Sequence, residues 1–272
     1  MPIETTSHEV SASIVDLDRL ESWPAELTSE ITPLLPAIRA EQQASLASAL
    51  SGEHWHRPSP PTPSTQAAHE IVRREMASRR IRVFHTTRLL DFDAVRREGL
   101  RPLDLEQQIG TMKKVLVATQ RFTTLEELGR LISTVDIDDG FFRNREGQVW
   151  ATPLRRLLHD GGCAVFFDHW GGEAIQRLAH MASDELEAAI QALGTPAVVT
   201  FTISAFGCCT FSDWRLPPTM IGLMLESAGF IERNTEAWDV LVKRAIPSEW
   251  IESVLPRDDP SLSAKTSLPG MT

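Results

Sequence analysis

The sequence predicts an α+β protein with a split, mainly antiparallel β-sheet, flanking helices and a helical N-terminal appendage. Three observations indicate this class. Helical and strand-like segments follow one another along the 272 residues without the regular βα repeat of a parallel sheet. No glycine-rich fingerprint follows any predicted strand, which argues against a Rossmann or P-loop domain. Hydrophobic residues make up 42 % of the chain, enough for a substantial core.

The N-terminal quarter is predicted to form an appendage and a linker. Apolar residues recur at helical spacing over residues 14–50, but three prolines divide this stretch into short pieces. The segment HRPSPPTPST is rich in Pro, Ser and Thr, which is typical of a stiff linker. We therefore expect a helical appendage at 1–55, a linker at 56–65, a main domain at 66–256 and a disordered tail at 257–272.

The main domain is predicted to begin with a helix, a strand and a second helix. The first helix covers about residues 65–78, and a strand follows at 80–86, where apolar residues alternate. Asp91 is a suitable N-cap and Gly99 a suitable C-cap for the next helix.

The rest of the domain is predicted to mix helices with short strands. Residues 104–143 are expected to be mainly helical, and 171–193 to form one amphipathic helix that ends at Gly194. The apolar run at 162–170 fits either a strand or a helix. Strands are expected at 147–153, 196–204 and 237–246.

The charge of the chain limits the classes of partner. The formal net charge is −10 and the pI is about 5.3, which argues against general affinity for nucleic acid, because such binding needs clustered Lys and Arg. One dense basic run, residues 73–83, is better interpreted as a solvated helix face beside a strand.

The cysteines and the apolar segments indicate a cytoplasmic protein. Cys163, Cys208 and Cys209 form no CxxC pair and no Cys/His spacing of a zinc site, so we expect neither a metal site nor a disulfide framework. The N-terminus carries acidic residues and no apolar run of the kind found in signal peptides. No stretch of 18 apolar residues occurs, so we expect no membrane span.

Two polar residues stand where predicted strands begin or end. His85 lies at the end of the 80–86 strand and is followed by Thr86 and Thr87. Glu236 comes just before the buried strand that starts at Asp239, and a carboxylate there can project into a cleft. Taken alone, each has a plain structural interpretation: the histidine satisfies buried backbone groups, and the glutamate is a solvated edge charge.

Taken together, the segments VFHTTRLLDFDAVRREGLRPL and TEAWDVLVKRAIPSEWIESV resemble the ADP-ribosyltransferase superfamily, in particular its bacterial, toxin- and effector-like members. The first resembles their entry motif, in which a strand ends in His and a short helix closes on "GL". The second resembles their Glu-bearing strand. The resemblance covers roughly residues 80–255 and implies an ADP-ribosyltransferase-like core with NAD as co-substrate and no metal.

The resemblance also implies roles for single residues. His85 hydrogen-bonds a ribose hydroxyl, and the backbone of Thr86, with Thr87 beside it, holds the nicotinamide carboxamide. Glu236 stabilises the positive charge that builds on the ribose as the N-glycosidic bond breaks. An aromatic ring stacks on the nicotinamide, and because the chain has no tyrosine, Trp or Phe must supply it. The candidates are Trp150 by position, and otherwise Phe166, Phe167, His169 or Trp170.

The stretch HWGGE, residues 169–173, has two interpretations. Two glycines that open a helix allow its N-terminal N–H groups to approach a cofactor phosphate or a substrate closely. The same letters also describe a glycine-rich turn in which Trp170 fills a core position.

The sequence therefore predicts a mono-ADP-ribosyltransferase that transfers ADP-ribose from NAD to a macromolecular acceptor, a protein or RNA rather than duplex DNA. The alternative is a catalytically inactive module of the same fold that binds a nucleotide, ADP-ribose or a partner protein. An RNA 2′-phosphotransferase would need cleft arginines, for which Arg88, Arg101 and Arg143 or Arg145 are available. The N-terminal helical region offers a place for a partner protein to bind.

Overall fold

A computed structural model describes residues 13–50, 62–137, 140–159, 161–207, 212–232 and 239–262. The α-helices are α1 (Ala25–Ile31), α2 (Leu35–Leu50), α3 (Pro63–Met76), α4 (Phe92–Glu98), α5 (Leu105–Ala118), α6 (Leu125–Ile132), α7 (Gly140–Arg143), α8 (Gly161–Asp168), α9 (Gly172–Ala182), α10 (Asp184–Gln191) and α11 (Ser212–Ser227). The strands are β1 (Ile14–Val15), β2 (Arg80–Leu89), β3 (Val149–Ala151), β4 (Thr195–Ser204), β5 (Val240–Val242) and β6 (Ile251–Pro256).

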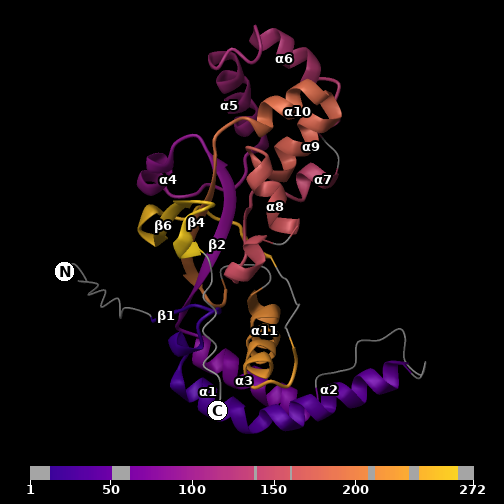
Figure 1. Ribbon diagram of the computed structural model, residues 1–272, viewed down its shortest axis with the longest axis vertical. Coiled ribbons are helices and arrows are strands. Elements are labelled where there is room, and N and C mark those ends of the chain that lie inside the picture. Colours follow the sequence, from indigo (N-terminus) through magenta and orange to yellow (C-terminus); the bar gives the residue numbers. More distant parts are fainter. Residues whose placement is uncertain are drawn as a thin grey trace, which may run out of the picture.

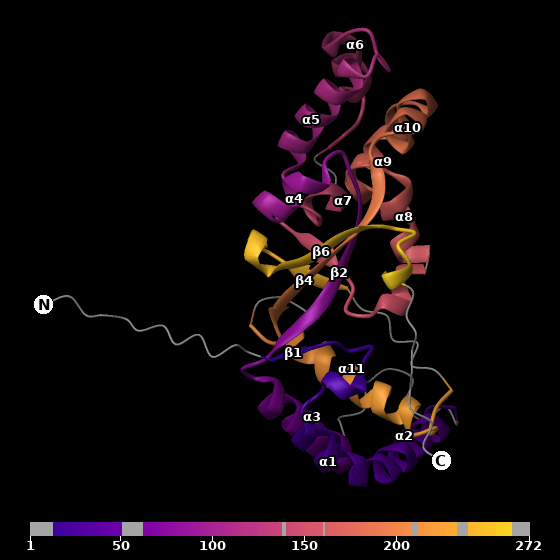
Figure 2. The ribbon, with the colours of Figure 1, turned by 60° about the vertical axis from the view of Figure 1, so that its left-hand side comes forward.

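The described strands form two sheets. The larger has the order β1-β2-β4-β6, with β1 parallel to β2 and the other neighbours antiparallel. The smaller is the antiparallel pair β3-β5. In Figures 1 and 2, helices α1, α2, α3 and α11 lie at one end of the sheets and α5, α6, α9 and α10 at the other. The predicted mixture of helices with mainly antiparallel strands is confirmed.

Strand β4 confirms the strand expected at 196–204 and is buried on both faces, although its alternation of apolar residues with Thr is typical of a half-buried strand. Val199 and Phe201 pack into the core formed with α3 and α11, whereas Val198, on the opposite face, packs against Phe167 of α8. Thr200 and Thr202 are buried as well. Both faces are buried because helices pack on each side of this central strand.

Several other elements differ from the predictions. The helix expected at 171–193 is two helices, because the Ser183 side chain accepts a hydrogen bond from the Leu186 N–H and starts α10. The run at 162–170 is mostly α8, and the strand expected at 237–246 is the shorter β5. Neither β6 nor α11 was expected.

The helix α4 and its caps agree with the sequence. The Asp91 carboxylate accepts hydrogen bonds from the N–H groups of Asp93 and Ala94, and Gly99 is the C-cap with φ = 78°. A Cβ on Gly99 would lie 1.9 Å from the carbonyl oxygen of Ile246, so both the positive φ and this close approach require glycine. Leu100 and Ile246 exchange backbone hydrogen bonds beside it, which ties the end of α4 to the chain before β6.

The described part of the N-terminal segment shares a core with the sheet. Leu27 and Ile31 of α1 are fully buried with Val72 and Met76 of α3, and β1 pairs with β2. The division into an appendage and a main domain stays a prediction, but no separate core is present in the described part of residues 13–48. Residues 1–12, much of the predicted linker and Glu236 lie outside the described residues.

The start of the predicted disordered tail has structure. A 3₁₀ turn spans Pro260–Leu262, and Leu262 is buried against Phe84 and Phe167. This apolar contact anchors the start of the predicted tail to the core, and residues 263–272 lie outside the described part.

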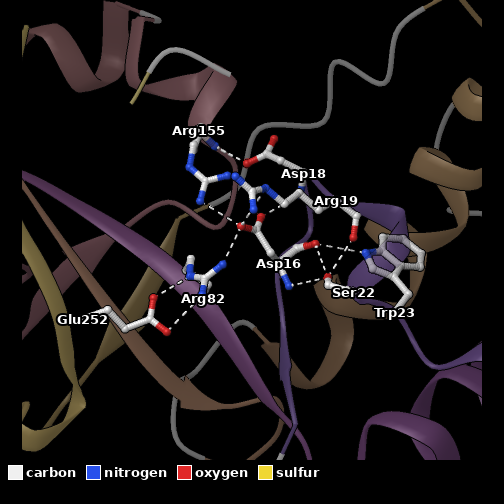
Figure 3. A network of polar contacts seen from close by, with 8 residues as sticks. All are labelled: Asp16, Asp18, Arg19, Ser22, Trp23, Arg82, Arg155 and Glu252. Atoms are coloured by element: carbon white, nitrogen blue, oxygen red, sulfur yellow. Dashed lines mark hydrogen bonds and ion pairs between the residues drawn. The ribbon is translucent and has the colours of Figure 1, made fainter. Parts of the chain in front are cut away.

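A buried carboxylate ties the N-terminal segment to the sheet (Figure 3). Asp16, which is 1 % exposed, accepts hydrogen bonds from Arg82 of β2 at 2.7 Å and from Arg155 at 2.8 Å. Arg155 opens the short 3₁₀ helix η3 (Arg155–His159), and its backbone N–H donates to Asp18 at 2.6 Å. Arg82 also pairs with Glu252 of β6. One carboxylate therefore joins three separate parts of the chain.

Removing this charge should destabilise the fold. Asp16→Asn keeps the side-chain shape but leaves Arg82 and Arg155 without their shared anion, so we expect the free energy of unfolding to fall by on the order of 3 kcal/mol. Urea denaturation followed by tryptophan fluorescence measures this. Asp93→Asn, which removes one partner of an exposed pair with Arg96, should leave stability nearly unchanged. Equal stability of both variants would contradict the assigned role.

Asp18 should make stability depend on pH. Burial is the main cause that raises its pKa from 3.8 to about 6, with a smaller contribution from Asp16, against the hydrogen bond from Arg155. The folded protein thus favours the protonated carboxyl, and its contribution to stability is lost as the pH rises through about 6. Between about pH 4 and pH 6, the interval between the unfolded and folded pKa values, the unfolding free energy should fall more steeply for the wild type than for Asp18→Asn. Parallel curves from urea titrations would contradict this.

Candidate functional site

The two sheets are joined at one residue pair and separate directly after it. Phe84 of β2 and Thr152 exchange backbone hydrogen bonds of 2.8 Å each. Continued antiparallel pairing would bring Thr86 opposite Trp150, but there the Trp150 carbonyl oxygen instead accepts a hydrogen bond from Nδ1 of His85 at 2.6 Å. Backbone groups point to alternate sides along a strand, so those of Thr86 point towards β3, as those of Phe84 do. Because the two strands separate here, the backbone groups of Thr86 lie at an opening between β2 and β3.

The imidazole of His85 presents a hydrogen-bond acceptor to this opening. A carbonyl oxygen only accepts, so Nδ1 carries the hydrogen, and in the neutral ring Nε2 is then an acceptor. Burial lowers the pKa of His85, and the hydrogen bond to Trp150 offsets part of this effect. The half-buried imidazole is therefore neutral at neutral pH, with one nitrogen committed to Trp150 and the other available.

A first cavity of about 680 Å³ lies at the opening. Its walls include His85, Thr86 and Thr87 from β2, Trp150 from β3, and Gln148 before it. The structure thus brings together four of the residues that the sequence predicted for the site.

The charged residues of the first cavity come from loops and from the start of α9. Arg101 follows α4, Arg145 follows α7, and Glu173 stands in the first turn of α9. Of these, the Arg101 side chain is mostly exposed and forms an ion pair with Glu98 at 3.1 Å.

A second cavity of about 740 Å³ adjoins the first. Both are lined by Thr86, Trp150, Phe166 and Glu173, which therefore form the wall between them. Asp239, directly before β5, lines the second cavity only.

Arg145 fixes the wall between the cavities. Its Nε and one terminal nitrogen donate to Oε2 of Glu173 at 2.9 and 2.8 Å. Its guanidinium lies over the Phe141 ring, 4.1 Å from the centroid, and 5.4 Å from the centroid of Trp150. The Trp150 ring is thus held from one side by a cation whose charge Glu173 balances.

Two glycines make the turn that brings Glu173 to the cavities. Gly171 and Gly172 have φ values of +84° and +68°, and a Cβ on Gly171 would lie 2.6 Å from the Ile175 side chain. Both glycines line the first cavity. Trp170 beside them is a buried core residue, as one of the two interpretations of HWGGE expected. Contact of this turn with an anion stays a prediction.

Asp239 is a site residue that the sequence analysis did not select. It lies exposed at the rim of the second cavity. Its pKa is raised, chiefly by partial burial and then by Glu173, while Arg145 lowers it. Glu236, three residues earlier, was predicted as the catalytic carboxylate and lies outside the described residues. The position of Asp239 immediately before the first buried residue of β5 was the signal available in the sequence.

Three of the predicted ring residues, Phe167, His169 and Trp170, line neither cavity. Phe167 is buried against Phe84 and Leu262, and Trp170 packs among residues of α5 and α9. Successive side chains on a helix point about 100° apart, so Phe166, the neighbour of Phe167 on α8, lines both cavities instead. Trp150 and Phe166 are therefore the rings available to a ligand.

Models of known protein families, curated proteins and solved structures were each compared with the chain, and none of these comparisons finds a match. Within the described ranges, no helix is long and apolar enough to cross a membrane. Over the same residues, no three His, Cys, Asp or Glu side chains are grouped as metal ligands would be. The function is therefore argued from the geometry of the two cavities.

The pKa values of two histidines, His85 and His180, should be shifted in opposite directions. The pKa of His85 is lowered by burial, whereas that of His180 is raised by its hydrogen bond to Glu187. In ring-proton NMR spectra recorded against pH, His85 should titrate below the usual value of about 6.5 and His180 above it. His85→Ala and His180→Ala assign the signals. A neutral His85 with its hydrogen on Nε2 would contradict the assigned hydrogen bond.

Proposed function

We propose that the protein is an NAD-dependent mono-ADP-ribosyltransferase that cleaves the bond between nicotinamide and ribose and transfers ADP-ribose to a macromolecular acceptor. The observation that carries this proposal is the meeting of His85, Thr86 and Trp150 at the opening between β2 and β3. Two sheets that separate after one shared pair are also what the resemblance in the sequence leads us to expect of the core.

The first cavity suits a nicotinamide riboside. The free Nε2 of His85 accepts from a ribose hydroxyl, and the backbone N–H and C=O of Thr86 match the acceptor and donor of a carboxamide. The Trp150 ring offers a stacking face, on which a cationic nicotinamide is favoured by the ring quadrupole.

The chemistry requires little beyond position and charge. As the bond to nicotinamide breaks, its electron pair stays on the ring nitrogen, which becomes neutral, and the ribose carbon gains positive charge. A carboxylate beside that carbon stabilises this charge more than it stabilises the substrate. Asp239, at the rim of the second cavity, has no ion pair within the described part of the chain, whereas Glu173 is paired with Arg145. Glu236 is the other candidate.

Release of nicotinamide from NAD tests the proposal. Wild-type protein should release it, and His85→Ala should slow release by about 10²-fold through loss of a positioned hydrogen bond. His180→Ala, an exposed histidine on α9, is the matched control and should retain full turnover. Full turnover by His85→Ala would contradict the site, and binding of NAD or ADP-ribose without release would favour the inactive binding module.

The same assay separates the two carboxylates. Asp239→Asn and Glu236→Gln keep the side-chain shapes, and the one that stabilises the transition state should lose about 10²- to 10³-fold in turnover. We expect this loss for Asp239→Asn. Asp258→Asn, at an exposed position after β6, is the control. A large loss for Glu236→Gln alone would return the role to Glu236.

A further inference from the structure

The second half of helix α2 lies in solvent. Leu35 and Ile38, in its first half, are buried in the core that α2 shares with α1, α3 and α11. Residues 42–47 are all exposed, and Figure 1 shows this part of the helix extending away from the neighbouring helices. We call residues 42–47 the α2 arm. Most helical stability in proteins comes from tertiary packing, so a partner that covered the arm would stabilise it.

The α2 arm is uncharged and carries an exposed apolar side chain. Leu46 is 61 % exposed, more than any other large hydrophobic residue in the described part of the chain. From Gln42 to Gly52 the sequence contains no Asp, Glu, Lys, Arg or His, although charged residues make up 24 % of the chain. The centres of protein interfaces are depleted in charged residues in the same way. These features suit the arm to contact with another apolar surface.

An apolar groove lies at the base of the same helix. It runs between the start of α2, the 3₁₀ turn η1 (Leu20–Ser22), α1 and the end of α11, and we refer to it as the α11 groove. Its described lining residues include no charged side chain. Its apolar walls are formed by Leu20, Leu35, Pro36, Met224 and Phe230. A helix that presents an apolar side chain is the kind of ligand that such a groove accepts.

The arm and the groove of one copy cannot meet, but those of two copies can. Leu35 lines the groove, and Leu46 lies about 16 Å further along the same helix, at a rise of about 1.5 Å per residue. If two copies lie with their α2 helices antiparallel, the arm of each lies beside the start of α2 in the other, where the groove is. A twofold axis makes both contacts at once, and such pairing is the commonest form of protein dimer.

The charge of the chain also favours a second copy as the occupant of the groove. A basic partner is attracted to acidic surface, and neither the arm nor the described lining of the groove carries an acidic residue. Two copies with a net charge of −10 each repel one another, so they associate most easily through surfaces on which both are neutral. The arm and the groove meet this condition, and each complements the other.

We propose that the protein forms a twofold dimer in which the α2 arm of each copy lies in the α11 groove of the other. Leu46 is then buried against the apolar walls of the groove, and the two α2 helices run antiparallel between the copies. None of the described residues that line the two cavities belongs to α1, α2 or α11. The dimer therefore stands independently of the proposed function.

The mass of the full chain in solution tests the dimer. Size-exclusion chromatography with light scattering, at about 1 to 100 µM protein, should give a mass near twice the 30.3 kDa of one chain that decreases on dilution. Leu46→Lys places a charge in the groove and should raise the dissociation constant at least about tenfold. Met181→Lys, which changes an exposed apolar residue of α9, is the control and should leave the mass unchanged. A monomer at every concentration, or a dimer that Leu46→Lys does not weaken, would overturn the proposal.

A second substitution tests whether the arm meets the groove. Ala228→Glu, at an exposed position on the groove wall, should also weaken the dimer. In an equimolar mixture of Leu46→Lys and Ala228→Glu, each mixed dimer has one unaltered contact and one in which the introduced lysine meets the introduced glutamate. The mixture should therefore return to nearly twice the mass of one chain, and a mixture that remains monomeric would overturn the proposal. Circular dichroism checks that each variant is folded, and Leu46→Lys, at an exposed position, tests the proposal alone if Ala228→Glu does not fold.

Discussion

The backbone pair between Phe84 and Thr152 is the joint on which the rest of the site depends. One more pair of ladder hydrogen bonds would occupy the backbone of Thr86 and close the gap beside Trp150. The His85 side chain takes the place of that next contact by donating to the Trp150 carbonyl oxygen. A carbonyl at this position would otherwise be unsatisfied, which costs free energy when it is away from water. The same hydrogen bond therefore keeps the sheets apart and orients the imidazole.

The buried Asp16 network supports this joint from the opposite side. Arg155 reaches Asp16 from three residues beyond Thr152, and its guanidinium lies 4.8 Å from the centroid of the Phe84 ring. Arg82 reaches the same carboxylate from two residues before Phe84. A buried ion pair adds little net stability compared with an apolar core, but it tolerates few alternative arrangements. We infer that it fixes the register in which β2 meets the chain after β3, and through it the opening.

Local signals allowed part of this structure to be predicted from the sequence. Asp91 and Gly99 marked the ends of α4 correctly, because a cap depends on a few neighbouring residues. His85 and Trp150 were selected by their positions in the family resemblance, and the two do lie together. The ion pair of Arg145 with Glu173 joins residues 28 positions apart, which no local pattern reveals. The orientation of α8, which buries Phe167 and turns Phe166 to the cavities, is likewise set by packing.

The balance of charge at the wall explains how the Trp150 ring can be held in place without adding charge to either cavity. Glu173 neutralises Arg145, so the pair that holds Trp150 in place adds no net charge to either side. The other charged residues of the two cavities are Arg101, which lines the first and pairs with Glu98, and Asp239, which lines the second. Charges are screened over about 8 Å at physiological salt, and the effect of each is accordingly local. Changing Asp239 thus alters the second cavity while the neutral pair, the Trp150 ring and the His85 hydrogen bond that form the first cavity stay in place.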